Sequence, residues 1–174
     1  IPFIFQKQYK NQVVTIDSIS SKKRVVLLKG DNGSGKSTLL KAMVGIVKYN
    51  GIIELEGTRS YMNEVIHFPK DAMVKDIINA YNIIDKQSQI NQNKLIDHFE
   101  LSDKINHPIH SLSKGMKMKL QLICSFMIER DIYILDEPFS GLDQPSVIKL
   151  IAYIKSSPKQ FIIASHIGVE LGKD

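Results

Sequence analysis

The segment Gly30–Ser37, which reads GDNGSGKS, constrains the fold of this chain more than any other feature. An apolar run at Val25–Leu28 directly precedes it and predicts a buried strand, and the apolar spacing of Ser37–Val47 predicts a helix after it. The segment matches the phosphate-binding pattern of a glycine, any four residues and then Gly-Lys-Ser, in the strand–loop–helix order that this pattern requires. We therefore expect an α/β fold, and Gly30–Ser37 is called the phosphate loop below.

The chemistry of the phosphate loop predicts a nucleoside triphosphate bound together with magnesium. Its glycines permit positive φ angles, so backbone N–H groups and the positive end of the next helix can face phosphate oxygens. Lys36 is expected at the β and γ phosphates, the Ser37 hydroxyl on Mg²⁺ and Thr38 at the α phosphate. The expected nucleotide contacts are Asn32, Gly33, Ser34, Gly35, Lys36, Ser37 and Thr38. The alternative is a glycine-rich turn that merely precedes a helix.

A second apolar run, Ile132–Leu135, ends in two carboxylates, Asp136 and Glu137. Parallel sheets place their ligand sites at the carboxyl ends of strands, which suits both acids for catalysis. Asp136 is predicted to hold Mg²⁺, and Glu137 is predicted to polarise the attacking water as a general base. In the alternative interpretation, Asp136 only caps a turn before Pro138.

The remaining patterns predict one α/β domain over residues 1–174, with a mostly parallel sheet of the P-loop NTPase type. A composition of 43% hydrophobic and 24% charged residues excludes disordered and coiled-coil chains. Residues 71–129 are mostly helical in pattern and predict a helical subdomain, while apolar segments near the N-terminus predict a small antiparallel side sheet. The other expected elements are strands within residues 3–19, at Ile52–Glu56 and at Phe161–Ala164, and a helix at about Pro145–Lys155.

Charge and cysteine content restrict the partners and the compartment. The net charge of +5 is spread along the chain, so we expect no nucleic-acid partner. The single cysteine, Cys124, cannot form an internal disulfide or a zinc cluster, which favours the cytosol. The longest apolar run, Leu120–Ile128, is about half of the length that crosses a bilayer.

Three further motifs, together with the phosphate loop and the acidic strand, occur along the chain in an order that is diagnostic of one protein family. Leu112–Met116 reads LSKGM, Ser140–Asp143 reads SGLD, and Ser165 and His166 follow the last predicted strand. Together with the phosphate loop and the acidic strand, these motifs resemble the nucleotide-binding domain of an ABC ATPase. Leu112–Met116 is called the signature segment and Ser140–Asp143 the SGLD segment below.

The resemblance implies a dimer in which two such domains meet head to tail. ATP held by one phosphate loop would then be closed over by Ser113 and Gly115 of the other copy, and His166 would donate a hydrogen bond toward the γ phosphate. Ser113 is also a good helix N-cap on its own terms. Lys114 and Met116 replace the more common Gly and Gln, and this variant resembles the ATPase subunits of simple exporters.

The resemblance carries two weaker assignments. Tyr9 is similar to the aromatic residue that stacks on adenine, and strand packing is its alternative role. Glu64 stands where the family usually has a Gln that senses the γ phosphate. It could ligate Mg²⁺ through water, and a plain surface loop is the alternative. The chain ends eight residues after His166, so the resemblance implies a form shortened at its C-terminus.

The sequence therefore predicts an ATP-hydrolysing subunit that powers a membrane transporter, in the direction of export. Its expected partners are a second nucleotide-binding domain and a separate membrane-spanning subunit, at the inner face of the cell membrane. The alternative is a soluble ABC ATPase acting on ribosomes or nucleic acid. A single phosphate loop, a short Glu64–Ser113 segment and the lack of a cysteine set disfavour it. An inactive regulatory module is disfavoured because Lys36, Asp136 and Glu137 are all present.

Overall fold

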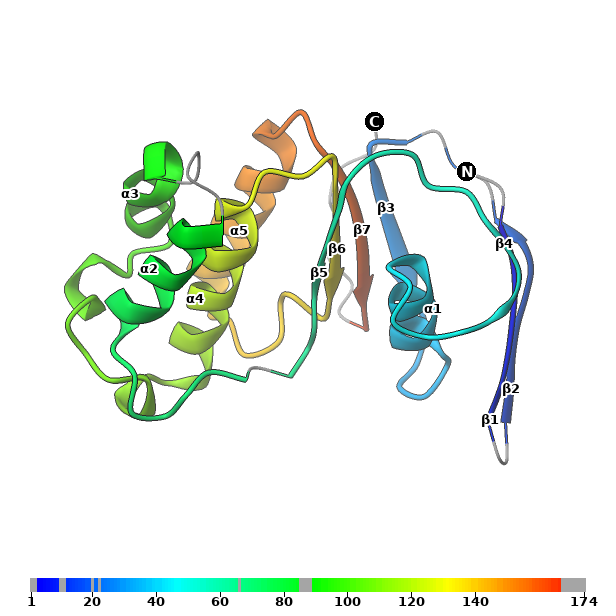
Figure 1. The fold of residues 1–174 in the computed structure, drawn as a ribbon, viewed down its shortest axis with the longest axis horizontal. Coiled ribbons are helices and arrows are strands. Elements are labelled where there is room, and N and C mark those ends of the chain that lie inside the picture. Colours follow the sequence, from blue (N-terminus) through cyan, green and yellow to red (C-terminus); the bar gives the residue numbers. More distant parts are fainter. Residues whose placement is uncertain are drawn as a thin grey trace. The chain divides into compact units, whose positions relative to one another are not determined.

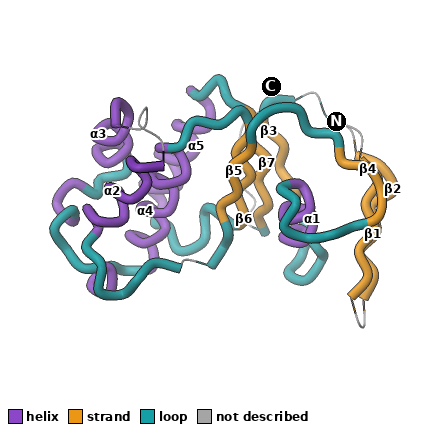
Figure 2. Tube along the Cα trace, in the orientation of Figure 1, coloured by secondary structure: helices purple, strands orange, loops and turns teal. Residues whose placement is uncertain are grey.

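The computed structural model describes residues 3–9, 12–19, 21, 23–65, 67–84 and 89–166 (Figure 1). The chain forms two compact units. The first consists of Ile1–Tyr61, Arg130–Glu137 and Pro158–Gly168, and the second of Met62–Glu129, Pro138–Ser157 and Val169–Asp174. Strands dominate the described part of the first unit and helices that of the second (Figure 2).

The first unit contains all but one residue, Met62, of a four-stranded sheet. The strands are β3 (Val25–Lys29), β5 (Arg59–Met62), β6 (Ile132–Asp136) and β7 (Gln160–Ser165). The strand order is β3-β7-β6-β5, and β7 pairs in parallel with both β3 and β6. All of β6 and all but the first residue of β7 are buried, which explains why both are apolar on both faces. The predicted α/β fold with a mostly parallel sheet is confirmed.

The helix α1 (Lys36–Met43) packs on one face of this sheet and fixes the position of the phosphate loop. Its buried residues are Leu39, Leu40, Ala42 and Met43, and they share a cluster with Ile132, Ile134, Ile162 and Ala164 of the sheet. Burying one large aliphatic side chain contributes roughly 1.5–3 kcal/mol. Because side chains alternate along a strand, Asp136 lies on the same side of β6 as this cluster.

The first unit also contains the small antiparallel sheet that the sequence predicts. Its strands are β1 (Phe3–Tyr9), β2 (Gln12–Ile19) and β4 (Asn50–Ile53), in the order β2-β1-β4. Both neighbouring pairs are antiparallel.

The described helices of the second unit are α2 (Val74–Ile84), α3 (Gln89–His98), α4 (Lys114–Met127) and α5 (Gln144–Ser156), with short 3-10 turns at Ser102–Lys104 and Ile109–Ser111. Phe126 of α4 stacks on Tyr153 of α5 with ring centroids 4.4 Å apart, and Phe99 lies beside both rings. Asp143 caps α5, since its Oδ1 accepts a hydrogen bond from the Ser146 N–H at 3.0 Å. Aromatic packing therefore explains where α4 and α5 meet, and the cap at Asp143 explains where α5 begins.

Some element boundaries differ from the prediction, because the conformation of a glycine or the pairing of strands sets them. The helix expected to reach Val47 ends at Met43, and Gly45 then adopts a φ of 78° that ends the helical path. The strand expected at Ile52–Glu56 is instead β4 (Asn50–Ile53), whose bounds are set by its pairing with β1.

Within the described ranges, there is no helix whose length and apolar character would suffice to cross a bilayer. A single domain over residues 1–174 stays a prediction.

Candidate nucleotide-binding site

The phosphate loop has a backbone that only glycine accommodates well. Gly33 and Gly35 have φ angles of 83° and 93°, in the left-handed region. A Cβ built on Gly30 would lie 2.9 Å from Ser34 Oγ, whereas a Cβ on Gly33 would meet no described atom within 4 Å. The Ser34 N–H donates to the Asp31 carbonyl at 3.2 Å and closes the turn. The loop is thus folded on itself and open beside Gly33, as a phosphate cradle requires.

Lys36 and the start of α1 add positive charge to this loop. Lys36 Nζ donates to the carbonyl oxygens of Gly30 at 2.5 Å and Asp31 at 3.0 Å. Phosphate oxygens would be stronger partners for an ammonium group, because they are charged. α1 begins after Gly35 without a side-chain cap and has no acidic residue in its first turn. This end of the helix therefore fits an anion.

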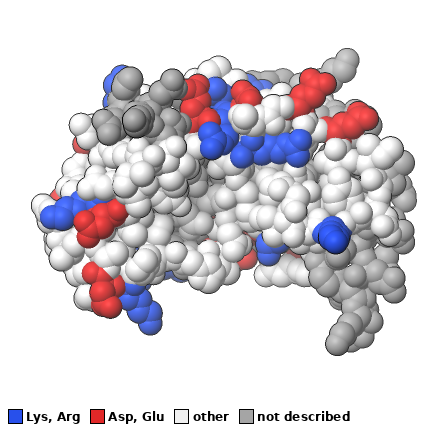
Figure 3. Space-filling model, in the orientation of Figure 1, with Lys and Arg blue, Asp and Glu red and all other residues white. Residues whose placement is uncertain are grey.

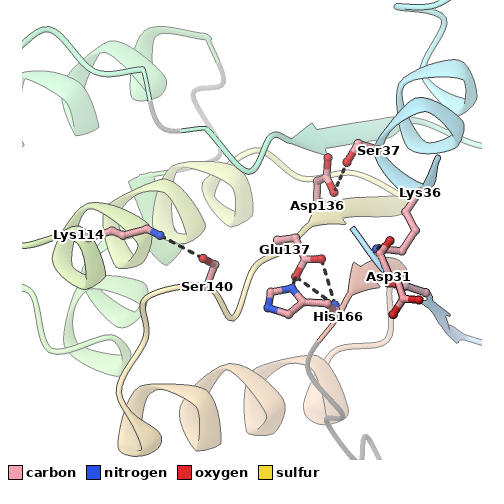
Figure 4. A network of polar contacts seen from close by, with 9 residues as sticks. Asp31, Lys36, Ser37, Lys114, Asp136, Glu137, Ser140 and His166 are labelled. Carbon is pink, nitrogen blue, oxygen red and sulfur yellow. Dashed lines mark hydrogen bonds and ion pairs between the residues drawn. The ribbon is translucent and has the colours of Figure 1, made fainter. Parts of the chain in front are cut away.

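Asp136 lies at the end of β6, with 1% of its surface exposed, and each of its carboxylate oxygens has a partner of its own. Figure 4 shows the bond to Ser37. Ser37 Oγ donates to Oδ1 at 3.0 Å, and Tyr61 Oη donates to Oδ2 at 3.2 Å. Three elements of the first unit, α1, β5 and β6, thus meet at one carboxylate. A hydroxyl and a carboxylate are the hard oxygen ligands that Mg²⁺ prefers, so Ser37 and Asp136 fit the predicted metal.

Burial raises the pKa of the Asp136 carboxyl above its ordinary value, because the charged form loses solvation there. The hydrogen bonds from Ser37 and Tyr61 act in the opposite direction. The charge of Glu137 raises the pKa further, while that of Lys41 lowers it. The ionised carboxylate is therefore less favourable in the folded chain than in water, and a cation beside it would offset this cost.

Glu137 is the residue at which the backbone turns after β6. Its φ of 49° lies in the left-handed region, which costs a residue with a side chain roughly 1–2 kcal/mol. The Glu137 N–H donates to the Ala164 carbonyl at 2.9 Å and holds this turn against β7. Backbone strain of this kind is common where a side chain must be presented for function.

The buried Glu137 carboxylate is held by His166, as Figure 4 shows. The His166 backbone N–H donates to Oε1 at 3.0 Å, and the ring Nδ1 lies 2.8 Å from Oε2. His166 follows β7 directly, and 47% of its side chain is exposed. The structure therefore brings the two predicted catalytic residues into contact.

The signature segment belongs to the second unit, and Ser113 caps α4 as the sequence predicts. Its Oγ accepts a hydrogen bond from the Met116 N–H at 3.2 Å. This bond satisfies one N–H at the start of the helix.

Gly115, in the first turn of α4, is in close contact with the SGLD segment. A Cβ built on Gly115 would lie 2.6 Å from the Gly141 carbonyl oxygen. The side chain of Lys114 lies along Gly141, and its Nζ donates to Ser140 Oγ at 3.3 Å (Figure 4). The close approach of these two segments therefore requires glycine at position 115, whereas the φ of 77° favours glycine at position 141.

The other predicted site residues lie as follows. Asn32 and Ser34 are exposed in the phosphate loop, and Thr38 is half-buried in α1. Glu64 is exposed in the segment after β5, and its role toward the metal stays a prediction. Tyr9 is in β1, but its side chain lies outside the described residues, so adenine stacking also stays a prediction.

Tyr61 is the site residue that sequence reasoning does not find. A tyrosine hydroxyl in a protein interior normally has a hydrogen-bond partner, which is a general signal. The sequence of β5, RSYM, lacks the apolar run that marks β6 and β7. The position of Tyr61 beside Asp136 is therefore visible only in the folded sheet.

Fold and site define a P-loop ATPase, and comparison with known proteins gives the family. The ABC transporter family model matches residues 15–140. An uncharacterized ABC transporter ATP-binding protein of Methanocaldococcus jannaschii is 35% identical over 147 residues, which cover 80% of this chain and 56% of that protein. Elongation factor 3 of Pneumocystis carinii is also 35% identical, over 145 residues that cover 80% of this chain and 13% of that protein.

A solved structure described as the ATP binding subunit of an ABC transporter has the same fold, with a TM-score of 0.81 and 23% identity. The match covers 96% of this chain and 80% of that one. The chain belongs to the ABC transporter family and has the nucleotide-binding domain of an ABC ATPase, a class that binds and hydrolyses ATP. It spans about half the length of its Methanocaldococcus jannaschii relative.

Replacing Asp136 with Asn tests the cost of burying this charge. The folded-state pKa is raised, so ionisation of Asp136 lowers the free energy of unfolding as the pH rises through that pKa. Without nucleotide, D136N should therefore be as stable as the wild type or more stable at about pH 7.5, as measured by urea denaturation. With ATP and Mg²⁺ the order should reverse, because only the wild type offers the Asp136 carboxylate to the metal. A nucleotide-free variant that unfolds more easily would contradict this prediction.

Replacing Gly115 with Ala separates helix propensity from packing. Alanine favours a helix by up to about 1 kcal/mol over glycine, so the change would stabilise α4 if space were available. Since the new methyl group would meet the Gly141 carbonyl, we expect G115A to lower the free energy of unfolding by about 1–3 kcal/mol. Urea denaturation of both proteins gives the sign directly, and a more stable G115A would show that the contact is not tight.

Proposed function

We propose that this chain is an ATP-hydrolysing subunit that powers a membrane transporter. The observation that supports it most directly is the 3.0 Å hydrogen bond between Ser37 and Asp136, which joins the phosphate loop to the acidic end of β6. A carboxylate at this point would repel phosphate unless a cation lay between them. The arrangement therefore supports a nucleotide bound together with Mg²⁺.

Glu137 supports hydrolysis rather than binding alone. In our proposal it takes a proton from a water molecule while the water oxygen attacks the γ phosphorus. The bond from this phosphorus to the β–γ bridging oxygen breaks, and ADP and phosphate result. Lys36 offsets negative charge on the β and γ phosphates, and Mg²⁺, when bound, would neutralise more of it. His166 orients the Glu137 carboxylate through its N–H and its ring, and its exposed ring edge is available to the γ phosphate.

The proposal includes a second nucleotide-binding domain as partner. Ser113 and Gly115 would contact ATP held by the phosphate loop of that partner and close the site over it. Family membership supports this role, and so does the helix that Ser113 caps, since the first turn of α4 directs N–H groups outward. Closure by ATP and opening after hydrolysis would convert turnover into movement.

The further partner is a membrane-spanning subunit, which would place this chain at the inner face of the cell membrane. The relatives that are transporter ATP-binding proteins support this assignment. Export is the direction that the signature segment supports, through its Ser-Lys-Gly-Met variant.

A soluble ATPase acting on ribosomes or nucleic acid is the second candidate function. The likeness to elongation factor 3 favours it. Figure 3 shows basic and acidic side chains interspersed on the face it draws, and such mixed charge attracts a phosphate backbone only weakly. We therefore place the transporter first.

Glu137→Gln tests the proposed chemistry. The amide keeps the size of the side chain but cannot take the proton from water, so the rate of ATP hydrolysis should fall about 100- to 10,000-fold. ATP affinity should remain within about twofold, because Lys36 and the phosphate loop are unchanged. The matched control is Glu56→Gln, an exposed carboxylate in the same unit. Steady-state turnover of E137Q close to that of the control would remove Glu137 from the role of general base.

Copurification separates the two candidate functions. The full protein is produced with an affinity tag in its own cells and purified in detergent. We expect it to be recovered together with a multi-span membrane protein. Recovery with ribosomal particles in its place, reversed by ribonuclease, would favour the second function.

A further inference from the structure

Tyr61 contacts the carboxylate of Asp136, which fits the metal of the proposed ATPase site. We propose that Tyr61 is a positioning residue that fixes the orientation of Asp136 for Mg²⁺, an inference that rests on the proposed ATPase function. Its hydroxyl donates to Asp136 Oδ2 at 3.2 Å, on the side of the carboxylate that Ser37 does not hold.

The position of Tyr61 is set by hydrogen bonds that hold β5 beside β6. At the start of the strand, Thr58 N–H and Oγ1 both donate to Asp131 Oδ2 at 2.7 Å. The Thr58 carbonyl accepts from the Ile132 N–H at 3.0 Å. These bonds anchor β5 where β6 begins, so the Tyr61 hydroxyl is carried to the place where β6 ends. The ring itself packs against the apolar cluster under α1.

Two donors fix a carboxylate where one does not. The Asp136 group can rotate about its Cβ–Cγ bond, and Ser37 alone restrains only Oδ1. With Tyr61 on Oδ2, both oxygens are held. Each oxygen can accept two hydrogen bonds or ligands, so a lone pair on each remains for a metal or its bound water. Groups that hold a metal ligand in this way commonly change metal affinity when they are removed.

A purely structural role predicts a different outcome. If the hydroxyl only satisfies its own need for a partner, its removal changes the stability of the fold and leaves the response to Mg²⁺ as it was. The two roles therefore differ in the factor by which Mg²⁺ increases nucleotide affinity.

The test compares Tyr61→Phe with Tyr133→Phe. Tyr133 lies in the same sheet, and its hydroxyl accepts a hydrogen bond from the Arg130 N–H at 3.3 Å, away from Asp136. The probe is a fluorescent ADP, which yields no turnover, titrated in excess Mg²⁺ and in EDTA. In EDTA all three proteins should bind it within about twofold of one another. The gain in affinity from Mg²⁺ should fall on the order of tenfold in Y61F alone.

Each other result decides the question. An equal Mg²⁺ gain in Y61F and wild type, or an equal loss with and without metal, would overturn the positioning role. In a D136N background, Y61F should change the Mg²⁺ gain no further, and an additional loss there would also contradict it. If nucleotide binds the wild type but gains nothing from Mg²⁺, the metal site is refuted and this inference with it. If no nucleotide binds, the proposed function itself fails.

Discussion

The buried carboxylate of Asp136 is the constraint on which the nucleotide-binding unit depends. Removing a charge from water is unfavourable, and here the cost is reduced by two hydroxyl donors, Ser37 and Tyr61, that come from different elements. Those donors can reach Asp136 only if α1 packs on the sheet and β5 lies beside β6. The core that Leu40, Ile134 and their neighbours form therefore sets the geometry of the site as well as the stability of the unit.

The same core supports backbone strain at the next residue. Glu137 adopts a left-handed conformation directly after a strand that is buried along its whole length. Its N–H bonds to β7, and its carboxylate bonds to His166 just beyond the end of that strand. A site whose acids follow one another in the chain can thus give them different directions. Asp136 faces α1 and β5, while Glu137 faces the end of β7.

The sequence allowed a good prediction wherever the chemistry is local. The phosphate loop, the apolar strand before Asp136 and the cap at Ser113 depend on residues near one another in the chain, and the structure has each where it was expected. Contacts between segments that are far apart in the chain are harder to predict from the sequence. β5 has a polar sequence, so neither the strand nor the approach of Tyr61 to Asp136 could be predicted. The pair of Glu137 and His166 was expected at one site, but the direct contact between them comes from the register of β6 and β7.

The contact between Gly115 and Gly141 has a mechanical consequence within the second unit. The two backbones are so close that not even a methyl group fits between them, and a hydrogen bond of 3.3 Å from Lys114 to Ser140 links their side chains. Repulsion between touching atoms rises steeply, whereas a single exposed hydrogen bond yields easily. Any movement that brings the two segments closer together is therefore strongly opposed at this contact.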